Sequence, residues 1–461
     1  MPSLIGLLAF ILILGAAVVL HEFGHFIVAK LLKIRVETFS VGFGPRLFGR
    51  RWGQTDYRVS AIPLGGYVKL GGDESNAPLE GAGATDIPPE EMFNLRPRWQ
   101  RILVALAGPV MNVLTAFSIP LAGGLLYGVP AIPASVVNYV VPGGAAEAAG
   151  LKPGDHIVQF DGTENPKWDT INGDGLLSPD QPLPLVVIRN GERITLNIKP
   201  TPHTENGETA GLLDFIPDYG GFPAVIHEVT SGSPAAAAGL LPGDRVMAVA
   251  GEKVGSAMQV TAYIREHRDQ PIHLTVERNG QVKELDTDSR RLADGVLGIK
   301  IGDEFPLHKV GVIGAAGYAY RSNVEIIKLT GKALGQVFTG KRSFGNTVSG
   351  PIGIYKITSS QVERLGWDGF FQILGFLSLN LGIFNLLPIP VLDGGAIFLL
   401  LIEGSLGIIG LTLSTTVRER IQQVGFVMVI LLMVFVITND VLKSFAPSSA
   451  PSKPAATTPA K

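Results

Sequence analysis

Four long apolar stretches recur along the chain and predict helices that cross a membrane. A hydrocarbon core of about 30 Å requires about 20 residues of helix, and the stretches meet or approach this length. We place these helices at residues 1–32, 102–132, 366–395 and 423–441. Only 17% of all residues are charged, well below the roughly 25% of soluble domains. The pattern therefore predicts a polytopic α-helical membrane protein.

Basic residues beside the apolar stretches predict the orientation of the chain. A group of them lies between the first and second stretches: Lys33, Arg35, Arg46, Arg50, Arg51, Arg58, Arg96, Arg98 and Arg101. Because cytoplasmic loops are enriched in Lys and Arg, residues 33–101 are expected in the cytoplasm and residues 133–365 outside. No Lys or Arg precedes Lys30, which argues against a cleaved signal peptide. We expect a multi-pass protein of a bacterial inner membrane, in contact with the lipid bilayer.

Charge and cysteine content exclude several other classes of protein. The net charge of −2 gives no basic surface of the kind that binds nucleic acid. The absence of cysteine excludes disulfides, Cys-rich zinc sites and thiol nucleophiles.

A repeat occupies the long segment between the second and third stretches. Gly150-Leu-Lys-Pro-Gly-Asp155 returns 89 residues later as Gly239-Leu-Leu-Pro-Gly-Asp244. Each copy is typical of a strand, a short Ala-rich helix ended by Gly, a Pro-Gly-Asp turn and a further strand. The repeat resembles circularly permuted PDZ domains of bacteria, here at residues 133–220 and 221–305, in the periplasm. Such domains bind peptides at a sheet edge, and the sequence leaves open whether these two bind peptides or act only as steric gates.

Two further segments have simpler patterns. Residues 306–365 begin with a helical pattern over 310–336 that predicts an amphipathic helix along the outer membrane surface. A loop is expected over residues 345–357. The Pro-, Ala- and Ser-rich residues 446–461 predict a disordered tail.

The first apolar stretch contains the motif His21-Glu22-Phe23-Gly24-His25. Two histidines four residues apart return to nearly the same face of a helix, so both can bind one metal ion. Zinc accepts imidazole nitrogens well, and a glutamate beside the first ligand can accept a proton from water at the metal. Ionisable groups inside an apolar span are costly and are usually functional. The alternative is a set of polar residues that line a helix interface.

A third metal ligand is expected from the third apolar stretch. The other histidines lie in the external segment, whereas Asp393 lies at the inner end of this stretch, at the depth of His21 and His25. Pro388 and Pro390 interrupt the helix before it, which is tolerated at membrane depth only in a protein-lined or watery site. The alternative is that Asp393 marks a helix end at the membrane surface.

Taken together, these motifs resemble the site-2 protease family. The motifs are His21-Glu22-Phe-Gly-His25, Gly108-Pro-Val-Met-Asn112, and the segment from Asn385 to Asp393-Gly394. The resemblance covers nearly the whole chain and implies Zn²⁺ held by His21, His25 and Asp393, with Glu22 as the catalytic base. It also implies substrate binding by Asn385 and by Pro388 in the same segment.

A β-hairpin is expected at about residues 56–70, where two short strand patterns flank Pro63, Gly65 and Gly66. The family resemblance implies that this hairpin dips into the membrane beside the metal. Its residues Gly65, Gly66, Tyr67 and Val68 would hold an extended substrate through backbone bonds. An ordinary cytoplasmic hairpin is the alternative.

The resulting hypothesis is a zinc metalloendopeptidase that cuts transmembrane segments in regulated intramembrane proteolysis. By the resemblance, its partner is a single-pass membrane protein such as an anti-sigma factor, or a remnant signal peptide, in the envelope stress response. A membrane-anchored protease for soluble substrates and a non-catalytic scaffold remain as rivals. A transporter is disfavoured because no inverted repeat is visible.

Overall fold

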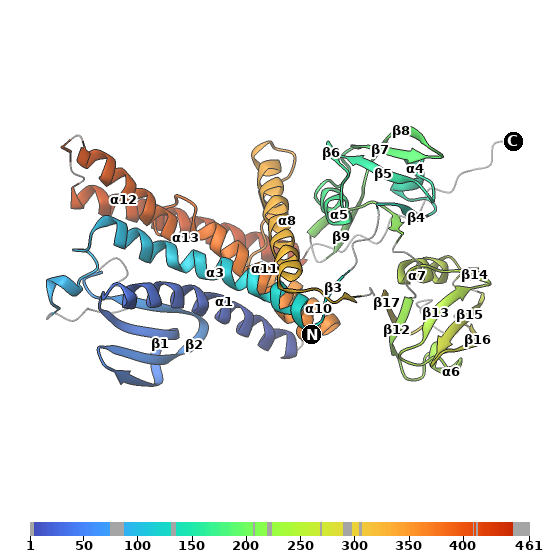
Figure 1. Ribbon diagram of the computed structural model, residues 1–461, viewed down its shortest axis with the longest axis horizontal. Coiled ribbons are helices and arrows are strands. Elements are labelled where there is room, and N and C mark those ends of the chain that lie inside the picture. The colour runs from blue at the N-terminus through green and yellow to red at the C-terminus, as the bar shows by residue number, and fades with distance from the viewer. Residues whose placement is uncertain are drawn as a thin grey trace. The chain divides into compact units, whose positions relative to one another are not determined.

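The computed structural model describes residues 4–73, 87–130, 135–205, 208–218, 224–267, 270–288, 297–303, 307–408, 410–411 and 414–445 (Figure 1). The chain divides into two compact units. Unit 1 comprises residues 1–126 and 311–446, and unit 2 comprises residues 127–310 and 447–461. The tail expected at residues 446–461 lies outside the described residues.

Unit 1 consists mainly of helices because its apolar runs are long and carry few charged residues. Its helices are α1 (Leu4–Leu31), η1 (Pro89–Glu91), α3 (Arg98–Leu126), α8 (Val312–Phe338), α9 (Phe344–Thr347), α10 (Pro351–Leu365), α11 (Trp367–Asn385), α12 (Asp393–Ile408) and α13 (Thr415–Phe445). Within the described ranges, α1, α3, α11 and residues 416–443 of α13 are long and apolar enough to cross a membrane. They correspond to the four expected spans, which supports the membrane-protein class.

Helix α3 is the centre of unit 1 and packs against α1, α8, α11 and α12 (Figure 1). Small residues allow the closest approach, as is usual between membrane helices. A Cβ atom at Gly24 of α1 would lie 2.2 Å from the carbonyl oxygen of Ala107 in α3. Glycine at this position therefore brings α3 against the turn of α1 that carries both histidines.

Two expectations for the second half of unit 1 are wrong. The third span does not run through to residue 395, because α11 ends at Asn385 and Asp393 begins a separate helix, α12. Pro388 and Pro390 lack the N–H donors that a continuous helix needs. The loop expected over residues 345–357 is also wrong, since α10 begins there with Pro351 in its first turn, a position where proline is favoured.

A bent β-sheet lies against α1 and is formed by β1 (Val36–Trp52) and β2 (Thr55–Leu70). The expected hairpin within residues 56–70 is wrong, because both ends of β2 pair with β1 rather than with each other. Phe39, for example, pairs with Val68 on one side and Tyr57 on the other. The segments therefore lie in the order 66–70, 36–41, 56–60 and 46–52. Gly42 and Gly65, with φ of +91° and +132°, allow the bends that a plain hairpin does not need.

Unit 2 contains two α+β modules, each with its own hydrophobic core. Module 1 comprises β4 (Val137–Val140), α4 (Ala145–Ala148), β5 (His156–Phe160), β6 (Thr163–Glu164), α5 (Trp168–Leu177), β7 (Leu183–Arg189), β8 (Glu192–Ile198), β9 (Thr201–Glu205), β10 (Glu208–Leu212) and β11 (Phe215–Pro217). Module 2 comprises β12 (Ala224–Val229), α6 (Pro234–Ala237), β13 (Arg245–Val249), β14 (Glu252–Lys253), α7 (Ala257–Glu266), β15 (Pro271–Arg278), β16 (Gln281–Asp288) and β17 (Ile299–Asp303). The short strands β3 (Val129–Pro130) and β18 (Leu307–His308) pair with each other.

The repeated Pro-Gly-Asp turns have the same structural role in both modules. Asp155 and Asp244 are fully buried, and each pairs with an arginine from a later strand. The shortest distances are 2.7 Å from Arg189 to Asp155 and 2.6 Å from Arg278 to Asp244. Burial opposes ionisation of Asp244, but the hydrogen bonds from Arg278 and from the Leu241 N–H, together with the positive charges of Arg278 and Lys283, lower the pKa of this carboxyl. The most recognisable motif of the repeat therefore stabilises the modules.

Candidate active site

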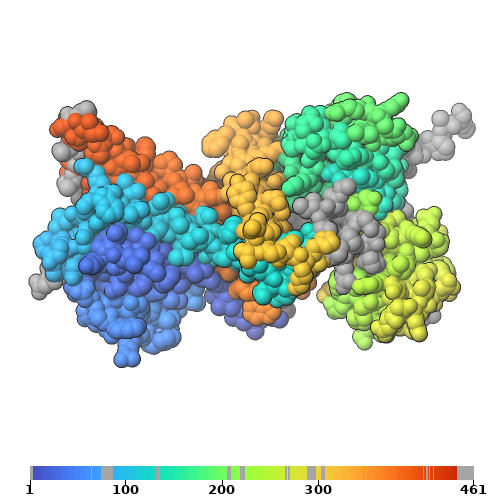
Figure 2. All heavy atoms as spheres, viewed as in Figure 1, coloured from blue at the N-terminus to red at the C-terminus, as the bar shows by residue number. Residues whose placement is uncertain are grey.

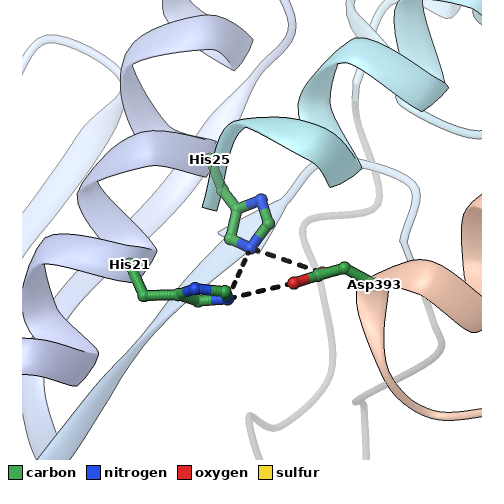
Figure 3. A group of neighbouring side chains, drawn as sticks. All are labelled: His21, His25 and Asp393. Carbon is green, nitrogen blue, oxygen red and sulfur yellow. Dashed lines mark hydrogen bonds and ion pairs between the residues drawn. The ribbon is translucent and has the colours of Figure 1, made fainter. Parts of the chain in front are cut away.

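The two motif histidines of α1 meet Asp393 at one point in unit 1 (Figure 3). The Nε2 atoms of His21 and His25 lie 3.2 Å apart. Asp393 approaches both, with Oδ2 3.0 Å from His21 Nε2 and Oδ1 3.4 Å from His25 Nε2. His21 is buried and the other two are partly buried. The structure thus brings together the three residues that the sequence indicated as metal ligands.

The donor set and its spacing fit a zinc ion. With bonds of 2.0–2.1 Å, neighbouring ligand atoms of tetrahedral zinc lie about 3.3 Å apart. The distance between the two Nε2 atoms, 3.2 Å, is close to this value. The carboxylate of Asp393 faces both nitrogens, with one oxygen 3.0 Å from His21 Nε2 and the other 3.4 Å from His25 Nε2. Two histidines and one carboxylate also leave a fourth position for water or substrate, as catalytic zinc requires. His21, His25 and Asp393 could therefore hold the metal.

Gly108 of α3 keeps the space beside the two histidines open. A Cβ atom at this residue would lie 2.4 Å from Nε2 of His25 and 2.7 Å from Nε2 of His21. No larger residue fits there without displacing the atoms that face the metal position. The sequence drew attention to Gly108 only through the family motif, because nothing local in the chain indicates what lies opposite a helical glycine.

Helix α3 also sets the protonation of both imidazoles. His25 Nδ1 lies 2.7 Å from the carbonyl oxygen of Val104 and donates its proton to it, so Nε2 is free to bind a metal. The side-chain nitrogen Nδ2 of buried Asn112 lies 3.1 Å from His21 Nδ1, and the Oδ1 of the same amide has no partner among the described residues. The two ends of an amide are assigned from their hydrogen bonds, so they can be exchanged. With Oδ1 turned to Nδ1, the amide accepts the Nδ1 proton. That orientation satisfies the orphaned oxygen and frees His21 Nε2.

The segment between α11 and α12 positions Asp393. A Cβ at Gly394 would lie 2.2 Å from the carbonyl oxygen of Leu386, and one at Gly395 would lie 2.1 Å from that of Ile389. The two glycines therefore let α12 begin tightly against the preceding turn, with Asp393 at its first position. Asn385 ends α11, and its Nδ2 lies 3.2 Å from His21 Nε2. Pro388 is exposed in the same connection.

Residues 63–68 of β2 run along α1 beside the site. A Cβ at Gly15 of α1 would lie 2.9 Å from the carbonyl oxygen of Pro63, and one at Gly66 would lie 3.5 Å from Val19. Further along, the backbone N–H of Val68 donates to the Glu22 carboxylate. Among the described residues, segment 66–70 pairs with β1 on one side and with no strand on the other. Because an outward-facing N–H of this segment reaches Glu22, its unpaired edge faces the candidate active site.

Comparison with known proteins agrees with this geometry. The model of the family described as Peptidase family M50 matches residues 9–432. A Vibrio cholerae protein named "Putative zinc metalloprotease" is 34% identical over 470 residues, which cover 94% of this chain and 97% of that protein. The "Regulator of sigma-E protease RseP" of Escherichia coli is 32% identical over 467 residues, 94% of this chain and 98% of that protein. Its counterpart of the same name in Salmonella typhimurium is 33% identical over the same length and shares.

Fold, site and relatives together define a zinc metalloprotease with helices that can cross a membrane. The chain belongs to peptidase family M50, the site-2 proteases.

Proposed function

We propose that this protease cuts the transmembrane segments of single-pass membrane proteins. The depth of the site within α1 carries the proposal. His25 and His21 precede the last residue of α1, Leu31, by six and ten positions, which at 1.5 Å per residue is about 9 and 15 Å of helix. Ionisable groups so far inside an apolar helix are costly and are kept for function. A protease for soluble substrates would have no need of this position.

In this proposal the zinc ligands are His21, His25 and Asp393, and Glu22 is the base. Bound zinc supplies Lewis acidity to the scissile carbonyl and to the attacking water. Glu22 accepts the proton of that water and returns it to the leaving amine. The Asn385 amide, 3.2 Å from His21 Nε2, donates a hydrogen bond to the substrate backbone next to the scissile bond.

The unpaired edge of residues 66–70 gives the substrate a place to bind. A helical segment hides its peptide bonds in its own hydrogen bonds, so cleavage requires local extension. An extended segment can add to a sheet edge through backbone bonds, with little dependence on its side chains. Gly66, Tyr67 and Val68 supply this edge, and Gly65 precedes it at the bend of β2. Pro388 borders the substrate from the connection between α11 and α12.

For the physiological role we propose regulated intramembrane proteolysis in a bacterial inner membrane. Two relatives are named as regulators of sigma-E, and an anti-sigma factor already trimmed outside the cell membrane fits a site at this depth. Remnant signal peptides are a second substrate of the same form. The site lies toward the cytoplasm, and the two modules of unit 2 are periplasmic PDZ domains that exclude substrates with bulky external parts.

The direct test compares wild type with Glu22→Gln on a trimmed, single-pass anti-sigma-factor substrate, with bound zinc measured in both proteins. Because only the base is removed, Glu22→Gln should keep its zinc and lose cleavage by at least the 10²–10⁴-fold typical of a general base. Retained cleavage in the zinc-loaded variant would assign the base elsewhere. A wild-type protein that binds no zinc and does not cleave would favour the alternative of a non-catalytic scaffold.

A further inference from the structure

The outer strand of the sheet in unit 1, residues 46–52 of β1, exposes large apolar and basic side chains together. Leu47, Phe48 and Trp52 are 63%, 65% and 79% exposed. Arg50 and Arg51 are exposed as well, and neither forms an ion pair within the described part of the chain. The sheet stands out from the helices of unit 1 as the blue projection in Figure 2. A surface of this composition marks an interaction site.

Contacts with α1 place this outer strand at a defined depth. Lys30, in the last turn of α1, donates from Nζ to Oγ1 of Thr55 at 3.3 Å, and Thr55 pairs with Trp52. Trp52, with the neighbouring arginines, therefore lies level with the end of α1, where the chain turns basic. Pro63 lies beside Gly15, near the middle of α1. The sheet thus extends from the end of α1 to about half its length.

Side-chain chemistry changes along the sheet in the direction that a bilayer requires. Exposed Phe43 and Ile62 lie toward the middle of α1, where Phe43 pairs with Ile62. Trp52, Arg50 and Arg51 lie at its end. Tryptophan is enriched at the level of lipid headgroups, and arginine binds phosphate through paired N–H donors. Basic residues next to a cytoplasmic membrane face also attract anionic lipids.

We propose that residues 46–52 bind the headgroups of anionic phospholipids in the cytoplasmic leaflet, with Arg50 and Arg51 on the phosphates and Phe48 and Trp52 in the interface. The proposal rests on the membrane placement given under the proposed function. It has a consequence for that site. Segments 46–52 and 66–70 belong to one sheet, so headgroups bound at one edge hold the other edge at the depth of Glu22.

The test uses the intact Glu22→Gln protein in lipid nanodiscs, so that the readout does not depend on cleavage. The discs contain phosphatidylcholine with a minor fraction of either brominated phosphatidylglycerol or brominated phosphatidylcholine, with bromine near the headgroup end of the acyl chains. The protein has four tryptophans. The quenching of Trp52 is therefore obtained as the difference in fluorescence quenching between the protein with Trp52 and its Trp52→Phe variant. Arg50→Gln/Arg51→Gln is then compared with Lys152→Gln/Lys253→Gln, which removes equal charge from exposed positions of unit 2.

We expect both brominated lipids to quench Trp52. Phosphatidylglycerol should be enriched over phosphatidylcholine beside Trp52 by about fivefold for each arginine, the ratio that corresponds to about 1 kcal/mol per charge. The arginine double variant should lose this preference, and the lysine double variant should keep it. Absence of quenching, or equal quenching by the two lipids, would overturn the proposal. A further outcome would also overturn it: the Glu22→Gln protein shows no lipid preference, while Arg50→Gln/Arg51→Gln in the active protein with Glu22 abolishes cleavage of substrates with acidic flanks. The surface would then bind an acidic protein. An inactive wild type with intact lipid preference would refute only the proposed function.

Discussion

At the scale of single residues, the metal position depends on what α3 places beside the two histidines. Gly108 leaves room for the ligand atoms, while Val104 and Asn112 hold the protons on the far side of each ring. None of the three binds the metal itself. Their contribution is to fix which nitrogen is free and where it points, and a metal ligand needs both.

Substitution of Gly108 by alanine tests the steric part of this account. The added methyl group must displace the Nε2 atoms that face the metal, and a shift of about 1 Å at a reacting site costs roughly 100-fold in rate. We expect Gly108→Ala to lose zinc and to lose cleavage by about that factor. Gly123→Ala is the matched control, because Gly123 lies in the same helix with nothing within 4 Å of the new Cβ. Full zinc content in Gly108→Ala would contradict the geometry.

Substitution of Asn112 tests the protonation of His21. An acceptor at this position is required to keep the proton on Nδ1, so Asn112→Asp should retain zinc. Asn112→Ala should weaken zinc binding by about 10–100-fold, as loss of a partner of a ligating histidine does elsewhere. Zinc affinity is measured by competition with a chelator in detergent. If Asn112→Asp loses zinc as fully as Asn112→Ala, the amide donates to the ring and the assignment is wrong.

At the scale of elements, a buried carboxylate of α13 binds the start of α10. Asp440 accepts backbone N–H bonds at 3.0 Å from each of Gly350, Ile352 and Gly353. These donors are at the start of α10 and would otherwise lack partners. In the sequence, Asp440 is only a charged residue near the end of the fourth apolar stretch. Its role depends on which helix lies opposite, and the sequence of α13 does not contain that information.

Removal of this carboxylate should loosen α13 without affecting the metal site. Because three backbone donors would lose a charged acceptor, Asp440→Ala is expected to lower the free energy of unfolding by about 2–4 kcal/mol. Thermal unfolding in detergent gives the shift, with Thr438→Ala, an exposed neighbour in α13, as the control. Equal unfolding temperatures for the two variants would show that the contacts of Asp440 add nothing to stability.

The two modules of unit 2 cap equivalent short helices by different means. Ser233 lies at the N-cap of α6 and accepts from the backbone N–H of Ala236. The equivalent N-cap in module 1 is Gly144, and there the carboxylate of Asp214 accepts from Ala145 N–H at 3.0 Å. In module 2, the position equivalent to Asp214 is Gly298. A Cβ atom at Gly298 would lie 2.3 Å from the Cβ of Ser233, so the capping serine leaves no room for a side chain there. The exchange preserves one cap per helix.

At the scale of the whole molecule, the predictions that agree with the structure rest on local or topological patterns. The spacing of His21 and His25 is a property of one helix. Asp393 could be paired with them because the sequence predicted it at the same depth, at the inner end of the third apolar stretch. The spans themselves follow from length and hydropathy. None of these inferences requires knowledge of which surfaces pack together.

The features that the sequence did not reveal all depend on such packing. The outer strand 46–52 and the pairing of both ends of β2 with β1 arise from a bend that only the assembled sheet defines. Helix α12 was merged with the third span because the pattern marks Pro388 and Pro390 as an interruption but not as a turn between two helices. Asn112 is a single amide in the uncharged residues 102–126 of α3, and its role appears only when His21 lies opposite it.

The most direct test of the central claim is the position of the bond that the enzyme cuts. A single-pass substrate is cleaved by the protein in lipid nanodiscs, and the new termini are identified by mass spectrometry. The depth of His21, His25 and Glu22 in α1 predicts a cut inside the apolar segment of the substrate, in the half nearer the cytoplasm. A cut confined to residues outside the apolar segment would contradict intramembrane proteolysis and favour a membrane-anchored protease for exposed substrates.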